Sequence, residues 1–127
     1  MIIHATELPE TPQDPRPLVL KRVINIDEHT SQISVTWSRI WGHHDRVVNE
    51  TSDRVYYVIG GSARFQVGDG NVEPVSAGDF VFIPHGVGYE FEGEMEYIVM
   101  NGPAFRTGSD KVLPPTMAPG GRGPAPK

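Results

Sequence analysis

The chain has 127 residues, a length that fits one domain with a single hydrophobic core. Its formal net charge of −5 at pH 7 argues against a nucleic-acid partner, because such proteins usually present a basic patch. The chain contains no cysteine, which excludes disulfides, thiolate metal ligands and cysteine nucleophiles.

Both ends of the chain differ in composition from the middle. Residues 1–17 are rich in proline and carry acidic side chains but no apolar core segment, so we expect an extended arm and no signal peptide. Residues 106–127 are rich in proline and glycine and have little apolar surface to bury, which predicts a disordered tail. The expected folded domain therefore spans residues 18–105. No apolar run approaches the ~20 residues of a membrane span, so we expect a cytoplasmic protein with no membrane partner.

Short strands and turns are predicted along the whole folded region. Residues 18–26 alternate weakly between apolar and polar side chains, and residues 33–41 alternate clearly. Gly60 and Gly61 predict a hairpin turn between a β-branched, aromatic strand and the strand that follows. The remaining strands are expected at 54–59, 63–67, 71–75, 80–83, 88–91 and 95–100. This regular succession of short strands predicts an all-β, antiparallel jelly-roll barrel.

Two ordered groups of residues with fixed spacing lie inside this region. The first reads G-x5-V-x-E-x3-R-x6-G and runs from Gly42 to Gly61; the second reads G-x5-P-x-G-x2-Y-x3-G and runs from Gly78 to Gly93. They resemble the two signature motifs of the cupin family, G-x5-H-x-H-x3/4-E-x6-G and G-x5-P-x-G-x2-H-x3-N. The resemblance implies a cupin barrel. Within it, Gly78 is expected to adopt a positive φ, and Asp79 to hydrogen-bond back to its turn.

The four positions that bind a metal in cupins hold Val48, Glu50, Arg54 and Tyr89. The resemblance implies that all four side chains point into the mouth of the barrel. Valine offers no ligand atom and arginine repels a cation, so at most Glu50 and Tyr89 remain as donors. Two donors are too few for a stable transition-metal site. We therefore expect neither a metal nor another cofactor.

The candidate catalytic residues are Tyr89, Glu50 and Arg54. One interpretation is an ion pair between Glu50 and Arg54 that fills the volume left by the metal. The other is a site in which Arg54 receives an anionic or carbonyl group of a ligand, with Glu50 holding Arg54 in place. Tyr89 is either a structural pocket residue or a general acid or base whose pKa is lowered by Arg54.

The candidate substrate-binding residues are aromatic or basic: Trp37, Arg39, His43, Tyr56 and Phe91. Trp37 and Arg39 lie on the face of 33–41 that is usually inward in cupins, and an aromatic wall with few polar groups is typical of small-molecule sites. Because adjacent residues of a strand face opposite ways, at most one of His43 and His44 faces the pocket. We take His43 as the candidate.

Three functions are compatible with these residues. The first is a metal-independent enzyme that acts on a small organic molecule bearing a carbonyl, carboxylate or phenol, by the acid–base chemistry of an isomerase, epimerase, cyclase or lyase. The second is a non-catalytic cupin that binds a small molecule. The third is a metalloenzyme, such as a dioxygenase, with unusual ligands. Cupins commonly pair, and the proline-rich arm is compatible with a homodimer.

Overall fold

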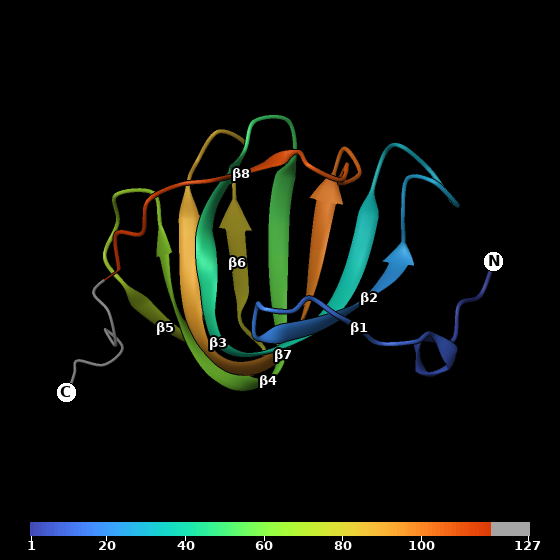
Figure 1. The fold of residues 1–127 in the computed structure, drawn as a ribbon, viewed down its shortest axis with the longest axis horizontal. Helices are drawn as coiled ribbons and strands as arrows, with labels where there is room; N and C mark the ends of the chain where they lie inside the picture. The colour runs from blue at the N-terminus through green and yellow to red at the C-terminus, as the bar shows by residue number, and fades with distance from the viewer. Residues whose placement is uncertain (118–127) are drawn as a thin grey trace.

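A computed structural model describes residues 1–117, and its strands form one antiparallel sheet that curls into a barrel (Figure 1). The elements in chain order are the short 3-10 helix η1 (Ala5–Glu7) and the strands β1 (Thr11–Pro12), β2 (Leu18–Ile24), β3 (Ser34–Asn49), β4 (Asp53–Val67), β5 (Glu73–Ser76), β6 (Phe80–Ile83), β7 (Tyr89–Gly102) and β8 (Asp110–Val112). The strand order is β1-β2-β3-β7-β4-β5, with β6 paired to β4 and β8 paired to β3. The all-β antiparallel fold predicted from the sequence is confirmed.

The three longest strands bend through the closed end of the barrel, where Figure 1 shows a U-shaped profile. Residues 54–59 and 63–67 belong to the single strand β4, and the predicted hairpin turn at Gly60 and Gly61 is wrong. These glycines instead mark a bulge in the pairing of β4 with β7. Gly61 has a φ of +78°, and a Cβ there would lie 2.2 Å from the carbonyl oxygen of Glu94. The bend thus requires glycine because the two backbones approach so closely.

The turn of the second motif has the expected geometry. Gly78 has a φ of +93°, and the Asp79 carboxylate accepts a hydrogen bond of 2.8 Å from the backbone N–H of Ser76. Both predictions for this turn are confirmed. Between the walls of the barrel lies an apolar and aromatic core, formed by Leu18, Ile40, Val47, Tyr56, Val58, Ala63, Phe65, Ile83, Tyr89, Phe91, Met95 and Tyr97.

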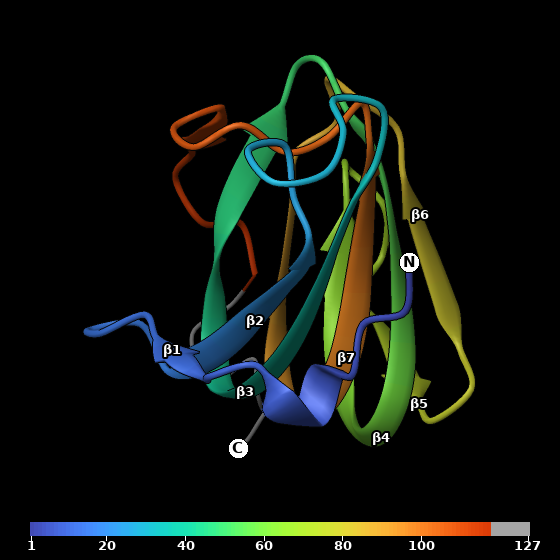
Figure 2. The ribbon, with the colours of Figure 1, turned by 90° about the vertical axis from the view of Figure 1, so that its right-hand side faces the viewer.

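Two strands lie outside the range 18–105 expected for the barrel. β1 pairs with β2, and the N-terminal segment runs along the outside of the barrel wall (Figure 2). β8 pairs with the end of β3, and Met117 beyond it is buried. Residues 118–127 of the predicted tail lie outside the described residues. Within residues 1–117 the one helical turn is far too short to cross a membrane.

Candidate active site

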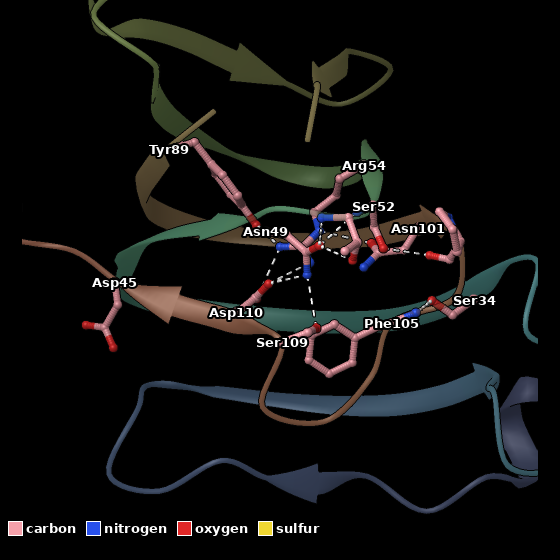
Figure 3. A network of polar contacts seen from close by, with 12 residues as sticks. Ser34, Asp45, Asn49, Ser52, Arg54, Tyr89, Asn101, Phe105, Ser109 and Asp110 are labelled. Atoms are coloured by element: carbon pink, nitrogen blue, oxygen red, sulfur yellow. Dashed lines mark hydrogen bonds and ion pairs between the residues drawn. The ribbon is translucent and has the colours of Figure 1, made fainter. Parts of the chain in front are cut away.

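Arg54 is the centre of a buried polar cluster at the open end of the barrel (Figure 3). It lies near the start of β4, and its Nε donates to the side chain of Asn101, its neighbour on β7, over 3.0 Å. The two terminal nitrogens donate to the Asp110 carboxylate over 2.9 and 3.2 Å, and one of them also donates to the Tyr89 hydroxyl over 2.6 Å. Burial opposes the charge of Arg54, but Tyr89, Tyr56 and Asp110 raise its pKa above the ordinary value. The guanidinium is therefore permanently charged and fixed in position.

Asp110 is the ionic partner of Arg54, a role that the sequence analysis gave to Glu50. It reaches the cluster because β8 pairs with β3, which places Asp110 opposite Asn49. The Asn49 amide donates to Asp110 over 2.9 Å, and its oxygen accepts from the backbone N–H of Ser52 over 2.8 Å. The turn that leads into β4 and the C-terminal strand are thus tied to the same cluster.

A β-bulge explains why Val48 and Glu50 do not point into the barrel. His44 pairs with Phe91 but Val47 pairs with Tyr89, so β3 carries one extra residue between these two points. One extra residue moves every later side chain to the opposite face. Val47 consequently joins the core, Val48 faces the other side, and Glu50 is exposed beyond the end of the strand. The prediction that four motif side chains meet in the mouth holds only for Arg54 and Tyr89.

The hydroxyls of Tyr89 and Tyr56 continue the cluster into the core. Their oxygens lie 2.6 Å apart, and both rings are buried. Burial raises the pKa of Tyr89, and Arg54 opposes this without reversing it. Burial likewise raises the pKa of Tyr56 well above its ordinary value, with Tyr89 adding to the effect. Both phenols therefore stay protonated at neutral pH, and the lowered pKa predicted for Tyr89 is wrong.

His44 is the histidine that faces the interior, where it stacks on Phe91 with 4.5 Å between ring centroids. Its Nδ1 lies 2.7 Å from the backbone carbonyl oxygen of Asp45. Since a carbonyl can only accept, Nδ1 carries the proton and Nε2 keeps its lone pair. Burial lowers the pKa of His44 to about 4, and the charge of Arg54 acts in the same direction. The ring is therefore neutral at pH 7.

These groups border a pocket of about 140 Å³ between β2, β3 and the cluster. Small polar side chains of β3 form one wall, at Ser34, Thr36 and Ser38. His44, Arg54, Tyr56 and Tyr97 also line the pocket, whereas Tyr89 does not. A liquid water molecule occupies roughly 30 Å³, so the pocket has room for a small organic group. Tyr89 lies behind this surface, where it contacts Arg54 and Tyr56.

The other predicted binding residues lie elsewhere. Trp37 is on the outer face of β3, where its Nε1 donates to Glu96 over 2.7 Å. Arg39 lies on the same outer face and pairs with Glu10 over 3.4 Å. His43 also faces outward, and its Nε2 lies 2.8 Å from the buried Glu90 carboxylate. Phe91 is fully buried in the core behind the pocket. Of the predicted binding residues, only Tyr56 borders the pocket.

The inward face of β3 had a signal in the sequence. The small polar residues at 34, 36 and 38 alternate with bulky ones, and the same alternation leads through Ile40 to His44. The resemblance to cupins implied that Trp37 and Arg39 face inward, because their face of this strand is usually inward in that family. In this barrel the interior wall keeps small side chains, which leave space for the pocket. No sequence pattern indicated Asp110 as a site residue, because it lies in the segment that was predicted to be a disordered tail.

The residues at the metal position of the cupin motifs do not fit a metal ion. Val48 and Glu50 face away from the pocket, and the permanently charged Arg54 takes the place of a ligand. In residues 1–117 no three His, Asp or Glu side chains are grouped to hold a metal. The donor set is suited to binding and polarising an organic oxygen atom instead.

No protein-family model matches the chain, and no curated protein does. Solved structures are similar over most of its length. A structure of PAC13 from Streptomyces with uridine has a TM-score of 0.75 at 20% identity, covering 89% of both chains; Pac13 is described as a nucleoside dehydratase.

Two further structures have slightly lower TM-scores. KdgF from Halomonas sp. has a TM-score of 0.69 at 18% identity, covering 83% of this chain and 96% of that chain. The polyketide cyclase RemF from Streptomyces resistomycificus has a TM-score of 0.68 at 18% identity, covering 86% of this chain and 88% of that chain. All these similar structures are cupin-fold proteins, so the chain has the cupin fold that its two motifs predict.

Proposed function

We propose that this protein is a metal-independent enzyme that moves a proton on a small organic molecule bearing a carbonyl group, as an isomerase or a lyase. One observation carries the proposal above the others. A neutral histidine, His44, borders the same pocket as Tyr56 and Arg54, with its unprotonated Nε2 as the basic atom. A base, a hydroxyl donor and a fixed cation around one cavity are the parts that enolate chemistry requires.

His44 is the proposed general base. Its Nε2 takes a proton from a carbon next to the carbonyl group, and the electron pair of that C–H bond moves toward the carbonyl oxygen to form an enolate. Return of the proton to another carbon gives isomerisation, and its transfer to a departing hydroxyl gives elimination of water. The hydrogen bond from Nδ1 to Asp45 fixes the tautomer and the ring throughout.

Tyr56 is the proposed donor to the enolate oxygen. Arg54 can only donate, so the Tyr89 oxygen accepts from it and the Tyr89 proton is available for the Tyr56 oxygen. The Tyr56 proton is then left for a ligand in the pocket. Each donor in this chain strengthens the next, so Arg54 and Tyr89 both assist Tyr56, and Tyr89 does so from behind the pocket surface. Removing a donor of this kind typically costs about 10²–10³-fold in rate.

The similar structures support the class of reaction. Pac13 is described as a nucleoside dehydratase and RemF as a polyketide cyclase. Structures of Pac13 with uridine include variants in which a tyrosine is replaced by phenylalanine or a histidine by glutamine. Tyrosine and histidine are also the residue types that border the pocket here. The homodimer and the cytoplasmic location expected from the sequence remain predictions.

The adjacent histidines provide a matched test. The protein is incubated in D2O with a panel of small carbonyl compounds, including aldehyde and ketone sugars and nucleoside aldehydes, and ¹H NMR follows deuterium uptake and loss of water. We expect turnover with the native chain, also in the presence of a chelator. The H44Q variant should lose about 10²–10⁴-fold, the usual contribution of a general base. The H43Q variant should keep its turnover, because His43 lies on the outer face.

Two results would contradict the proposal. Equal rates for H44Q and H43Q would remove His44 from the chemistry, and a rate that depends on added metal would favour the metalloenzyme. Saturable binding of a panel compound without deuterium uptake or elimination would identify the non-catalytic binding protein instead.

A further inference from the structure

We propose that the substrate carries a negatively charged group, a phosphate or a carboxylate, which Arg16 and Arg22 hold at the mouth of the pocket. The inference deepens the proposed function and rests on it, since it names the class of molecule that reaches His44 and Tyr56. The anchor and the reacting part of the substrate would then occupy opposite ends of one cavity.

The charges around the pocket do not balance. Its lining includes three arginines, Arg16, Arg22 and Arg54, and a single acidic residue, Asp110. Arg54 already uses the Asp110 carboxylate in a direct pair. The two remaining arginines therefore give this cavity a positive potential, although the whole chain has a formal net charge of −5. A basic cleft in an acidic protein attracts anionic ligands and increases their local concentration.

Neither arginine has an acidic partner within residues 1–117. Arg16 donates to the neutral side chain of Gln13 over 3.0 Å, and no ion pair forms at its guanidinium. Arg22 borders a second hollow together with Asp27 and Glu28, but neither carboxylate forms an ion pair with it. Two guanidinium groups that border one cavity without a carboxylate partner can bind a phosphate or carboxylate through paired N–H donors.

The position of the two arginines places the anion at the entrance. Arg22 follows Leu18 and Leu20 at alternate positions of β2, so all three point toward the pocket. Arg16 comes from the hairpin between β1 and β2 and is close enough to lower the pKa of Tyr97, against the dominant effect of burial. Both arginines are exposed, whereas Tyr56 is buried. A charged group at the entrance leaves the neutral part of the molecule at Tyr56 and His44.

Anion binding can be measured without knowing the substrate. Inorganic phosphate and acetate are titrated separately into the full ¹⁵N-labelled chain, and NMR follows the side-chain Nε–Hε signals of the arginines. We expect saturable shifts of the Arg16 and Arg22 signals with at least one anion, and the stronger of the two identifies the group. The double variant R16Q/R22Q should bind at least about tenfold more weakly. The control R39Q, which removes one positive charge from the outer face, should bind like the native chain.

Several outcomes would overturn the inference: equal dissociation constants in all three proteins, shifts centred on other arginines, or no saturable shift with either anion. The H44Q variant separates this failure from failure of the proposed function. It should keep anion binding while losing turnover. Normal anion binding together with unchanged turnover in H44Q would sink the proposed chemistry and leave the anion site in place.

Discussion

Two neighbouring residues of β7 belong to two polar clusters on opposite faces of the sheet: an inner cluster around Tyr89 and an outer cluster around Glu90. Tyr89 points into the barrel, where Arg54 and Tyr56 contact its hydroxyl. Glu90 points to the outer face, and its buried carboxylate accepts hydrogen bonds from the backbone N–H groups of Thr116 and Met117 over 2.6 and 2.9 Å. Both side chains are almost fully inaccessible, and each lies next to a buried arginine.

The difference between the clusters is what lies beside them. The chain itself occupies the outer cluster, because residues beyond β8 fold over Glu90 and donate to one of its carboxylate oxygens, and the other oxygen lies 2.8 Å from the Nε2 of His43. The inner cluster borders a cavity that His44, Arg54 and Tyr56 line. A buried charge with perturbed pKa is thus a weak sign of function on its own. A buried charge beside a cavity is a stronger one, and the predictions below test this distinction.

The largest effect is expected from Arg54→Leu. The change leaves Asp110 without its cation and removes a donor from both Tyr89 and Asn101. Loss of one partner of a buried ion pair costs about 3–5 kcal/mol in the free energy of unfolding, which urea denaturation measures. Arg54→Lys keeps the charge and should cost less. A loss below about 1 kcal/mol for Arg54→Leu would show that the inner cluster is not a structural unit.

Acidification should destabilise the protein through His44. Its pKa is lowered to about 4 in the folded state from 6.5, so between these values the unfolded chain binds a proton that the folded chain does not. The free energy of unfolding therefore falls as the pH drops from 6.5 toward 4, by at most about 3 kcal/mol. Glu90 titrates below its ordinary value of 4.5, outside most of this window.

The H44Q variant isolates this contribution. Urea unfolding at a series of pH values gives the free energy of unfolding as a function of pH. Between pH 4.5 and 6.5 this free energy should change less with pH in H44Q than in the native chain. Parallel curves for the two proteins would mean that His44 has an ordinary pKa in the folded state.

The outer cluster should respond to Glu90→Ala in a different way. Two backbone donors lose their acceptor and Arg46 loses a nearby carboxylate, which should cost about 2 kcal/mol of stability. Hydrogen exchange should become faster at Thr116 and Met117, while anion binding at the pocket stays unchanged. Glu90→Gln keeps one acceptor oxygen and should cost less. Altered anion binding at the pocket of Glu90→Ala would show that the two clusters are coupled.

The smallest stability effects are expected from the two tyrosines. Tyr56→Phe and Tyr89→Phe each remove a buried hydroxyl and should cost about 1 kcal/mol. Their effects on turnover should differ, because Tyr56 borders the pocket whereas Tyr89 reaches a ligand only through its hydrogen bond with Tyr56. Steady-state kinetics should therefore show the larger loss in kcat for Tyr56→Phe. The opposite order would make Tyr89 the direct donor.

The sequence predicted the fold well because glycine and proline spacing determines turns locally. The turn at Gly78 follows from that spacing, and the resemblance to the cupin motifs implied that Arg54 and Tyr89 both point into the mouth of the barrel. Side-chain direction along β3 was not predictable in the same way. The bulge after His44 reverses the faces, so Val48 and Glu50 turn away from the site.

Two residues of the site, Asp110 and His44, could not be predicted from local sequence patterns. Asp110 is 56 residues away from Arg54 in the chain, and only the pairing of β8 with β3 brings them together. The choice between His43 and His44 depended on which face of β3 is inward. The resemblance to cupins suggested the wrong face, because here the cavity is lined by small polar side chains.

The most direct test of the account is the protonation state of His44. Ring ¹⁵N and ¹³C chemical shifts, followed by NMR across a pH titration, report both its tautomer and its pKa. We predict a neutral ring with the proton on Nδ1 and a pKa of about 4. A pKa at or above 6.5, or a proton on Nε2, would contradict the claim that the barrel presents a neutral base to its pocket.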